Sequence, residues 1–360
     1  MKKLLTHRNV ELFSNILCYN CFKIFGIPKK LPVFLTINVN DLCNSRCRIC
    51  NIWKNDSEKK VKEQLKLWEF ERIFKNYGNL YWVTITGGEP FLRKDLVEVV
   101  KTIYNNTRPL YLTITTNGMV RKKILKDVAS ILENCPHMNL IINVSIDGKE
   151  KDHDFIRGVK GSYRLAKHTI KDLKSIESEK LIVGVNTVIS KYNVKNFENS
   201  YKHILKAIEP DSFIFEIAEN RAKLYNNDLD ISPDATHKQK ALDFLIENTN
   251  IQVGDIIPNL RKMYYESLYE RRFHENFEGI ASGYIMSNGE VRLSDSMKLV
   301  AGNVRNLDYN FRRIWFSKRA EAIRVKMKKG YCSIISNAFY VNYLCNIKNL
   351  PEFIFSVYFR

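Results

Sequence analysis

The sequence predicts an α/β protein built on six parallel strands, arranged either as a partial barrel or as an open doubly wound sheet. Short β-branched segments alternate with longer segments of helical periodicity, and six such β/α units follow one another. Six units are fewer than a closed eightfold barrel needs. The 360 residues, 45% hydrophobic and 27% charged, can form a large core, which excludes a disordered or collagen-like chain.

The β/α units follow one another without interruption. The expected strands are Val33–Val39, Tyr81–Thr86, Leu110–Thr115, Leu140–Ile146, Leu181–Ile189 and Ser212–Ile217. The expected helices between them are Trp68–Tyr77, Asp95–Tyr104, Arg121–Asn134, Tyr163–Ile176 and Val194–Ala207. A helical crossover makes consecutive strands parallel, so all six carboxyl ends meet at one edge. We expect the functional site there.

Two further regions flank this core, which gives a basic amphipathic segment over residues 1–32, the core over 33–225 and an α+β region over 226–360. In the first region, apolar residues recur at helical spacing before Pro28. This pattern predicts a helix packed on the core or, alternatively, one lying in a membrane interface. In the last region we expect three helices, near Thr236–Glu247, Leu260–Phe273 and Phe311–Lys328. We also expect a hairpin of two strands, Gly283–Met286 and Glu290–Leu293, with its turn at Ser287-Asn288-Gly289.

The net charge of +18 permits an anionic partner such as lipid headgroups, nucleic acid or a phosphorylated substrate. Basic residues are densest between Arg312 and Lys329, which is either a solvated helix face or an anion-facing surface. No apolar stretch is long enough to span a membrane, and no secretory signal is apparent. We therefore expect a cytoplasmic protein, with peripheral membrane contact as the alternative.

Three of the eight cysteines, Cys43, Cys47 and Cys50, follow the first expected strand with the spacing C-x3-C-x2-C. Three thiolates on one short loop can converge on a soft metal centre. A structural zinc site or a closed four-iron cluster needs four protein ligands, and no Cys or His follows Cys50 closely. Three ligands leave one iron of a [4Fe–4S] cluster open for a substrate or cofactor.

Motifs at the next strand ends accompany this cysteine loop. They are Gly87-Gly88-Glu89-Pro90, Thr115-Thr116-Asn117-Gly118, Ser145-Ile146-Asp147-Gly148 and His153-Asp154-Phe155-Ile156-Arg157-Gly158. Each alone has an ordinary alternative, such as a tight turn or, for Arg157, a surface charge. Together and in this order they resemble the radical S-adenosylmethionine (radical SAM) superfamily over about residues 33–220. The resemblance implies a partial (β/α)6 TIM-like barrel with a small C-terminal α+β extension, similar to a SPASM or twitch region.

The resemblance also implies the cofactors and their ligands. Cys43, Cys47 and Cys50 would hold a [4Fe–4S] cluster. The residues implied for S-adenosylmethionine are Ile49, Gly87, Gly88, Glu89, Pro90, Thr116, Asn117, Ser145, Asp147 and Arg157. Glu89 would face the methionyl ammonium, and Ser145 and Arg157 the carboxylate. The cluster would cleave S-adenosylmethionine to a 5′-deoxyadenosyl radical that takes hydrogen from an unidentified small molecule, lipid-linked intermediate or peptide. An electron donor such as a flavodoxin or ferredoxin is then a partner.

The C-terminal region departs from the family pattern. The auxiliary-cluster cysteines expected near Ala281 and Ser294 are missing, and only Cys332 and Cys345 remain in the tail. We therefore expect no auxiliary cluster, with a site completed by other ligands as the alternative. Cys18 and Cys21 fall on one face of the expected first helix and are taken as packed side chains.

Three charged residues lie at the end of the sixth strand and just after it: Glu216, Glu219 and Arg221. They are candidates to bind substrate or relay a proton. Two other functions stay open: RNA modification by the same chemistry, and a non-catalytic zinc-binding regulatory role. No recognisable RNA-binding module follows the core, which disfavours nucleic acid as a partner.

Overall fold

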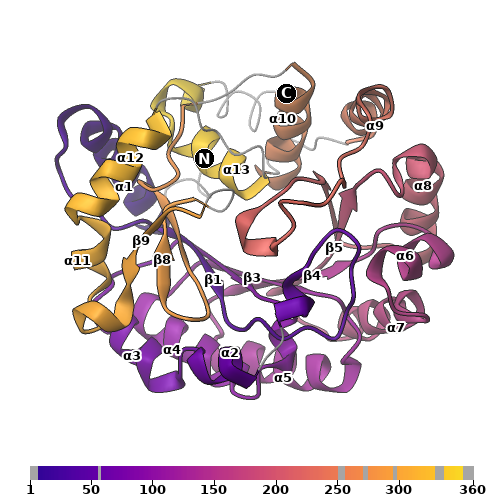
Figure 1. Ribbon diagram of the computed structural model, residues 1–360, viewed down its shortest axis with the longest axis horizontal. Coiled ribbons are helices and arrows are strands. Elements are labelled where there is room, and N and C mark those ends of the chain that lie inside the picture. The colour runs from indigo at the N-terminus through magenta and orange to yellow at the C-terminus, as the bar shows by residue number, and fades with distance from the viewer. Residues whose placement is uncertain are drawn as a thin grey trace.

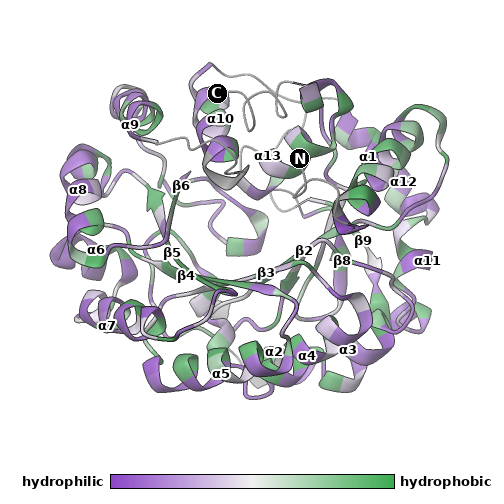
Figure 2. Ribbon diagram, turned by 180° about the vertical axis from the view of Figure 1, so that it is seen from behind, coloured by the Kyte–Doolittle hydropathy of each residue, from purple (hydrophilic) through white to green (hydrophobic). Residues whose placement is uncertain are grey.

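The computed structural model describes residues 7–55, 58–249, 256–270, 275–294, 298–328 and 336–351. These residues form one curved sheet with helices around its outer face (Figure 1). The sheet has nine strands in the order β6-β5-β4-β3-β2-β1-β7-β8-β9. Figure 2 shows hydrophobic strands enclosed by helices that are polar on one side.

Strands β1 to β6 are parallel, as expected, and form the partial barrel predicted from the sequence. Every expected strand boundary falls within one residue of the observed one, and the last two strands match completely. The strands are β1 (Phe34–Asn38), β2 (Trp82–Thr86), β3 (Tyr111–Thr116), β4 (Asn139–Ser145), β5 (Leu181–Ile189) and β6 (Ser212–Ile217).

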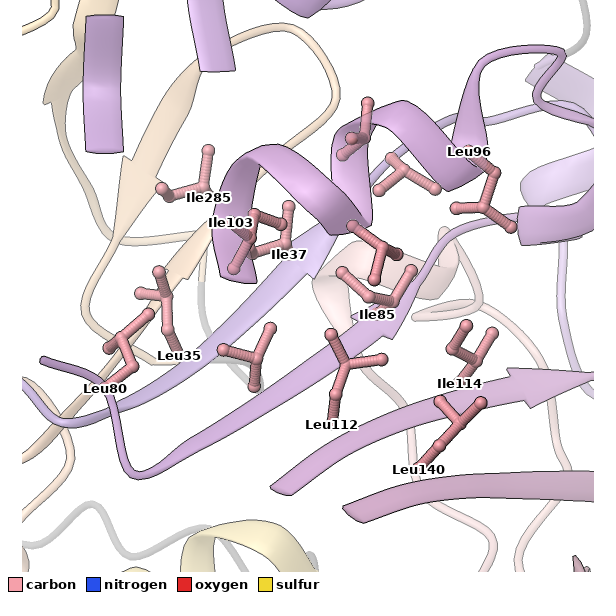
Figure 3. Close-up of a cluster of buried hydrophobic side chains, with 14 of the residues drawn as sticks. Leu35, Ile37, Leu80, Ile85, Leu96, Ile103, Leu112, Ile114, Leu140 and Ile285 are labelled. Atoms are coloured by element: carbon pink, nitrogen blue, oxygen red, sulfur yellow. The ribbon is translucent and has the colours of Figure 1, made fainter. Parts of the chain in front are cut away.

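Alternate strand residues point outward into the main hydrophobic core. Ile37, Ile85 and Ile114 are fully buried there and face the inner side of helix α4 (Figure 3). Helix α4 contributes Leu96 and Ile103 at helical spacing. The helices on this face are α3 (Leu67–Phe74), α4 (Leu96–Thr107), α5 (Arg121–Asn134), α7 (Ser162–Lys174) and α8 (Phe197–Ile208), preceded by the short α2 (Glu58–Glu63).

The predicted C-terminal hairpin is present, but it extends the core sheet instead of forming a separate one. Strand β7 (Ser282–Ile285) pairs in parallel with β1, and β8 (Glu290–Arg292) and β9 (Val300–Asn303) continue antiparallel. Pairing with β7 satisfies the backbone groups that β1 would otherwise expose at a sheet edge. This region was expected to be separate because the alternation of strand and helix ends after Ile217. The domain boundary near residue 225 stays a prediction.

Four helices lie at the open side of the barrel (Figure 1): α1 (His7–Phe25), α9 (Ala235–Asn248), α10 (Ile256–Glu270) and α13 (Ser336–Cys345). Helices α11 (Phe311–Trp315) and α12 (Lys318–Lys328) pack beside β9 and add to the main core. Helix α13 packs against α10 through Phe339 and Tyr264 and against α1 through Val341 and Cys345, and lies between α10 and α1 in Figure 1. Its Ser336 hydroxyl also donates a hydrogen bond to Glu216 of β6. It therefore bridges the two ends of the parallel sheet.

Of two expectations about these helices, one is wrong and one is confirmed. The single helix expected over Phe311–Lys328 is divided because the Ser317 hydroxyl accepts a hydrogen bond from the Ala320 amide at 3.1 Å and caps a new helix. The first helix packs on the core through Ile16 and Tyr19, as expected. Within the described ranges, no helix combines the length and apolar character that crossing a bilayer requires.

Candidate active site

A cavity of about 180 Å³ opens at the carboxyl ends of the parallel strands. Most of the predicted site residues lie in its wall. They are Cys43, Cys47, Ile49, Cys50, Gly87, Gly88, Thr116, Asn117, Ser145, Arg157, Glu216, Glu219 and Arg221. The topology explains the convergence, because parallel strands bring residues that are distant in sequence to one edge.

The cysteine loop after β1 is held by backbone hydrogen bonds from three neighbouring segments. The Arg46 amide donates to the Arg157 carbonyl at 2.9 Å, and the Glu89 amide donates to the Leu42 carbonyl at 2.7 Å. The Asn51 amide donates to the Leu224 carbonyl at 2.9 Å. The loop is thus fixed by its backbone, independently of the cysteine side chains.

Two glycines after β2 make this close docking feasible. A Cβ atom on Gly87 would lie 2.5 Å from the Asn40 carbonyl oxygen, and one on Gly88 would lie 2.1 Å from the Leu42 carbonyl oxygen. Both distances are far below van der Waals contact. The glycine pair therefore lets the cysteine loop approach β2, in addition to lining the cavity.

The three thiols form a donor set suited to a soft metal centre. Burial raises the pKa of Cys43 and Cys50 to about 12 and also raises the pKa of Cys47, while Arg157 lowers all three. A bound metal would displace these thiol protons, since a coordinating thiol is deprotonated. In the described part of the chain, no three Cys, His, Asp or Glu side chains converge on one ion. A four-iron cluster needs no such convergence because its thiolates bind separate irons.

Arg157 lies in the cavity wall and not on the helix surface. It ends α6 (Glu150–Arg157), a helix that we did not predict. Its Nε atom lies 2.7 Å from Asp147 Oδ2, and its side chain is only 12% exposed. Its Nη1 atom lies 4.0 Å from Cys47 Sγ. The surface-charge alternative is therefore wrong, and the buried Asp147 carboxylate, whose Oδ1 accepts from the Val188 amide at 3.1 Å, orients the guanidinium.

His153 contacts the backbone of Asp147, the residue that pairs with Arg157. Its Nδ1 atom accepts a hydrogen bond from the Asp147 amide at 3.1 Å, so the imidazole is neutral there. The side chain is 1% exposed. Burial, followed by the nearby Arg157 charge, lowers the pKa of His153 to about 4.

This buried imidazole predicts acid sensitivity. Below its ordinary pKa of 6.5, the unfolded chain binds a proton at His153 that the folded chain excludes until about pH 4. Folding stability should therefore fall with decreasing pH in this window, by about 3 kcal/mol in total. His153→Asn keeps an acceptor for the Asp147 amide and cannot titrate. The free energy of unfolding, measured with urea across this pH range, should depend less steeply on pH in the variant than in the parent. Identical pH dependence in the two proteins would contradict the assignment.

Glu89 is buried and does not line the cavity. Its carboxylate accepts hydrogen bonds from the Thr116 hydroxyl and the Asn117 amide, both at 2.7 Å, and from the Phe91 amide at 3.2 Å. Burial raises the pKa of Glu89 to about 7, and these hydrogen bonds lower it. Glu89 thus ties the end of β2 to the end of β3. Its contact with a ligand ammonium stays a prediction, and Pro90 and Asp147 likewise lie behind the wall.

The three candidates at the end of β6 and in the loop after it, Glu216, Glu219 and Arg221, face the same cavity. Arg221 Nη2 lies 3.4 Å from Glu216 Oε2, and the Ser336 hydroxyl at the start of α13 donates to Glu216 Oε1. Glu219 lines the cavity beside them. Helix α13 therefore positions Glu216, a candidate substrate-binding residue. This contact could not be predicted because the two residues are 120 positions apart in the sequence.

Asn226 is a site residue that sequence reasoning missed. It is fully buried, and its Nδ2 donates to the Ile49 carbonyl at 2.9 Å and to the Glu219 carbonyl at 3.2 Å. Its Oδ1 accepts from the Arg221 amide at 2.7 Å. One amide thus connects the cysteine loop to the loop after β6. An Asn in a polar loop carries no pattern that would have revealed this.

The expected auxiliary-cluster positions hold other side chains. The Tyr284 hydroxyl donates to Glu278 Oε1 at 2.9 Å, and Ser294 donates to Glu278 Oε2 at 3.4 Å. Ala281 and Cys345 are buried in a hydrophobic cluster. Cys332 lies outside the described residues.

We therefore predict a single cluster. Anaerobically reconstituted protein should contain about four iron atoms per chain, the content of one four-iron cluster. Cys345→Ala should leave that content unchanged, because its thiol packs in the core. Iron clearly above this value, lost in a Cys332→Ala and Cys345→Ala double variant, would show an auxiliary cluster.

Comparison with known sequences agrees with these motifs. A profile of the radical SAM superfamily matches residues 37–204. GTP 3',8-cyclase of Pasteurella multocida (strain Pm70) is 34% identical over 153 residues, covering 38% of this chain and 43% of that protein. Fe-coproporphyrin III synthase of Methanosarcina barkeri is 25% identical over 225 residues, covering 61% of this chain and 52% of that protein. The similarity thus spans about half the length of these relatives.

Solved structures share the fold over most of the chain. Native anSMEcpe with bound AdoMet and a Cp18Cys peptide superposes with a TM-score of 0.56 at 17% identity, covering 90% of this chain and 98% of that one. Streptococcus suis SuiB bound to S-adenosylmethionine gives a TM-score of 0.59 at 17% identity, covering 99% of this chain and 82% of that one. At this identity the likeness establishes the fold alone.

Proposed function

We propose that this chain is a radical SAM enzyme, because the profile of that superfamily matches residues 37–204. Its cavity then holds the [4Fe–4S] cluster and the S-adenosylmethionine that this family uses, and it removes hydrogen from a substrate at the same cavity. The main support for the proposal is that three thiols and Arg157, which is paired with Asp147, lie in the wall of one cavity. When bound, the two cofactors supply a carbon-centred radical that can attack an unactivated C–H bond. A place in this family of enzymes disfavours the non-catalytic zinc-binding alternative.

The cavity residues divide the remaining work. Cys43, Cys47 and Cys50 hold the cluster. Arg157, held by Asp147, attracts a carboxylate, and Ser145 beside it offers a hydroxyl. Apolar side chains on β5, β6 and the following loop limit the access of water. They are Val188, Ile217, Ala218, Leu224 and Ile231.

The substrate is proposed to meet Glu216, Glu219 and Arg221. In the described wall, the two arginines, Arg157 and Arg221, are each paired with a carboxylate. The wall therefore carries no excess positive charge that would favour a nucleoside triphosphate. This balance favours a peptide or a cationic small molecule over a substrate like the one that names GTP 3',8-cyclase. A lipid-linked substrate and RNA modification stay alternatives.

The electron must come from a separate donor, for which we propose a flavodoxin or ferredoxin. The proposed location is the cytoplasm.

The test is anaerobic reconstitution with iron and sulfide, chemical reduction, and chromatography for 5′-deoxyadenosine. Product that depends on both reductant and S-adenosylmethionine is expected. A fully loaded, reduced protein that forms none would overturn the proposal. Adding a peptide library or GTP separately then tests the substrate class, because a true substrate should accelerate product formation. Acceleration by GTP alone would contradict the peptide or cationic assignment.

A further inference from the structure

The end of helix α1 carries an unusual group of exposed apolar side chains. Ile24 and Phe25 are each 72% exposed, and Ile27 is 66% exposed. Among the described residues, no other large hydrophobic side chain exceeds 54% exposure. The same outer face of α1 continues with Val10, Phe13 and Leu17, which are also exposed. The opposite face anchors the helix in the core through Ile16 and Tyr19.

Basic residues surround this tip. Arg312 donates to the Lys29 carbonyl at 2.9 Å, and the Lys328 ammonium donates to the Lys23 carbonyl at 3.4 Å. Lys29 and Lys30 follow the tip directly and are exposed. These contacts bring positive charge from α11 and α12, far along the chain, beside the end of α1, as Figure 1 also shows.

Acidic charge near the tip is already engaged. The Glu275 carboxylate lies 2.8 Å from the Lys23 ammonium and 2.7 Å from the Lys348 ammonium. These hydrogen bonds lower the pKa of Glu275 to about 2, so it stays ionised and paired. The surface around Ile24, Phe25 and Ile27 is therefore apolar at its centre and basic at its rim.

We propose that this tip docks on a lipid bilayer that contains anionic headgroups. The apolar side chains would enter the acyl boundary while the basic rim contacts the headgroups. A second copy of the chain fits poorly, since two basic rims would repel. A nucleic acid would use the basic rim but would leave the apolar centre in water. The inference goes beyond the proposed chemistry and does not depend on it.

The test uses the full chain, anaerobically reconstituted, with sedimented vesicles of roughly two parts phosphatidylcholine to one part phosphatidylglycerol. Binding is expected, weakened by salt, and at least about tenfold weaker with phosphatidylcholine alone. Replacing Ile24, Phe25 and Ile27 by Asn should weaken binding by about a hundredfold or more, since each buried side chain contributes roughly tenfold. Lys29→Glu with Lys30→Glu should weaken it by a similar factor.

Matched controls lie on distant helices. Asn at Trp68, Leu165 and Leu205 removes three exposed apolar side chains from α3, α7 and α8. Lys122→Glu with Lys126→Glu makes the same charge change on α5. Both controls should bind vesicles within about twofold of the parent, because membrane charge acts within a Debye length.

Several outcomes would overturn the proposal. One is absence of vesicle binding. Another is a parent dimer, seen by light scattering, that the tip variant converts to a monomer. A third is a parent protein that binds an RNA oligonucleotide but no vesicles, and that loses this RNA binding only in the variants of Lys29 and Lys30. Formation of 5′-deoxyadenosine without vesicles should be equal in all variants, so failure of the chemistry and failure of docking are distinguishable.

Discussion

Replacing Cys43, Cys47 and Cys50 together by Ala is expected to abolish the iron–sulfur chromophore and all S-adenosylmethionine cleavage. The three thiols lie in one cavity wall and are the donors available to the cluster there. Without thiolate ligands the cluster cannot assemble. Visible absorption, iron and sulfide analysis and 5′-deoxyadenosine chromatography measure the result.

The fold should survive this change, because backbone hydrogen bonds from Glu89 and Arg46 hold the loop. Far-ultraviolet circular dichroism should therefore match the parent. Cys21→Ala provides the matched control. The expectation that Cys21 is a packed side chain is wrong, because its thiol is exposed on α1, and it lies outside the cavity. Full iron and sulfide in the triple variant would remove these cysteines from the cluster.

The parallel core was predictable because its signals are local. Each strand is a short β-branched run, and each outer helix repeats apolar residues at a fixed spacing. Ile37, Ile85 and Ile114 show the result, since alternate strand residues enter one core. The partner of β7 was not predictable, because pairing with β1 depends on which sheet edge stays open.

The positions of site residues were predictable where a motif follows a strand. The direction in which an individual side chain points was not. Parallel topology sufficed to bring Cys47, Asn117 and Ser145 together. It did not reveal that the Glu89 carboxylate is engaged by the Thr116 hydroxyl and the Asn117 amide. The direction of a buried carboxylate is decided by nearby donors, and two of the three that bind Glu89 come from the end of β3.

Asn226 marks a second limit. Its hydrogen bonds reach the Ile49 carbonyl, 177 positions earlier in the chain. No spacing rule connects two residues at this separation. Contacts made by single polar side chains between loops emerge only from the folded structure.

Arg157→Ala is expected to weaken S-adenosylmethionine binding by about 10- to 100-fold, the contribution of a charge-assisted hydrogen bond. The guanidinium lines the cavity and is held by Asp147 at 2.7 Å. The same change should also destabilise the fold by about 3–5 kcal/mol, because it leaves a buried carboxylate without its partner. Isothermal titration of reconstituted protein measures the first effect, and urea unfolding measures the second.

A double variant separates ligand binding from structural support. Asp147→Asn combined with Arg157→Ala removes both buried charges, and the Asn oxygen can still accept from the Val188 amide that now bonds Asp147. Much of the lost stability should return, since an unpaired charge no longer lies buried. The affinity for S-adenosylmethionine should stay low, because the guanidinium itself is absent. If affinity recovers together with stability, Arg157 only supports the wall, and the carboxylate of the ligand must be bound elsewhere.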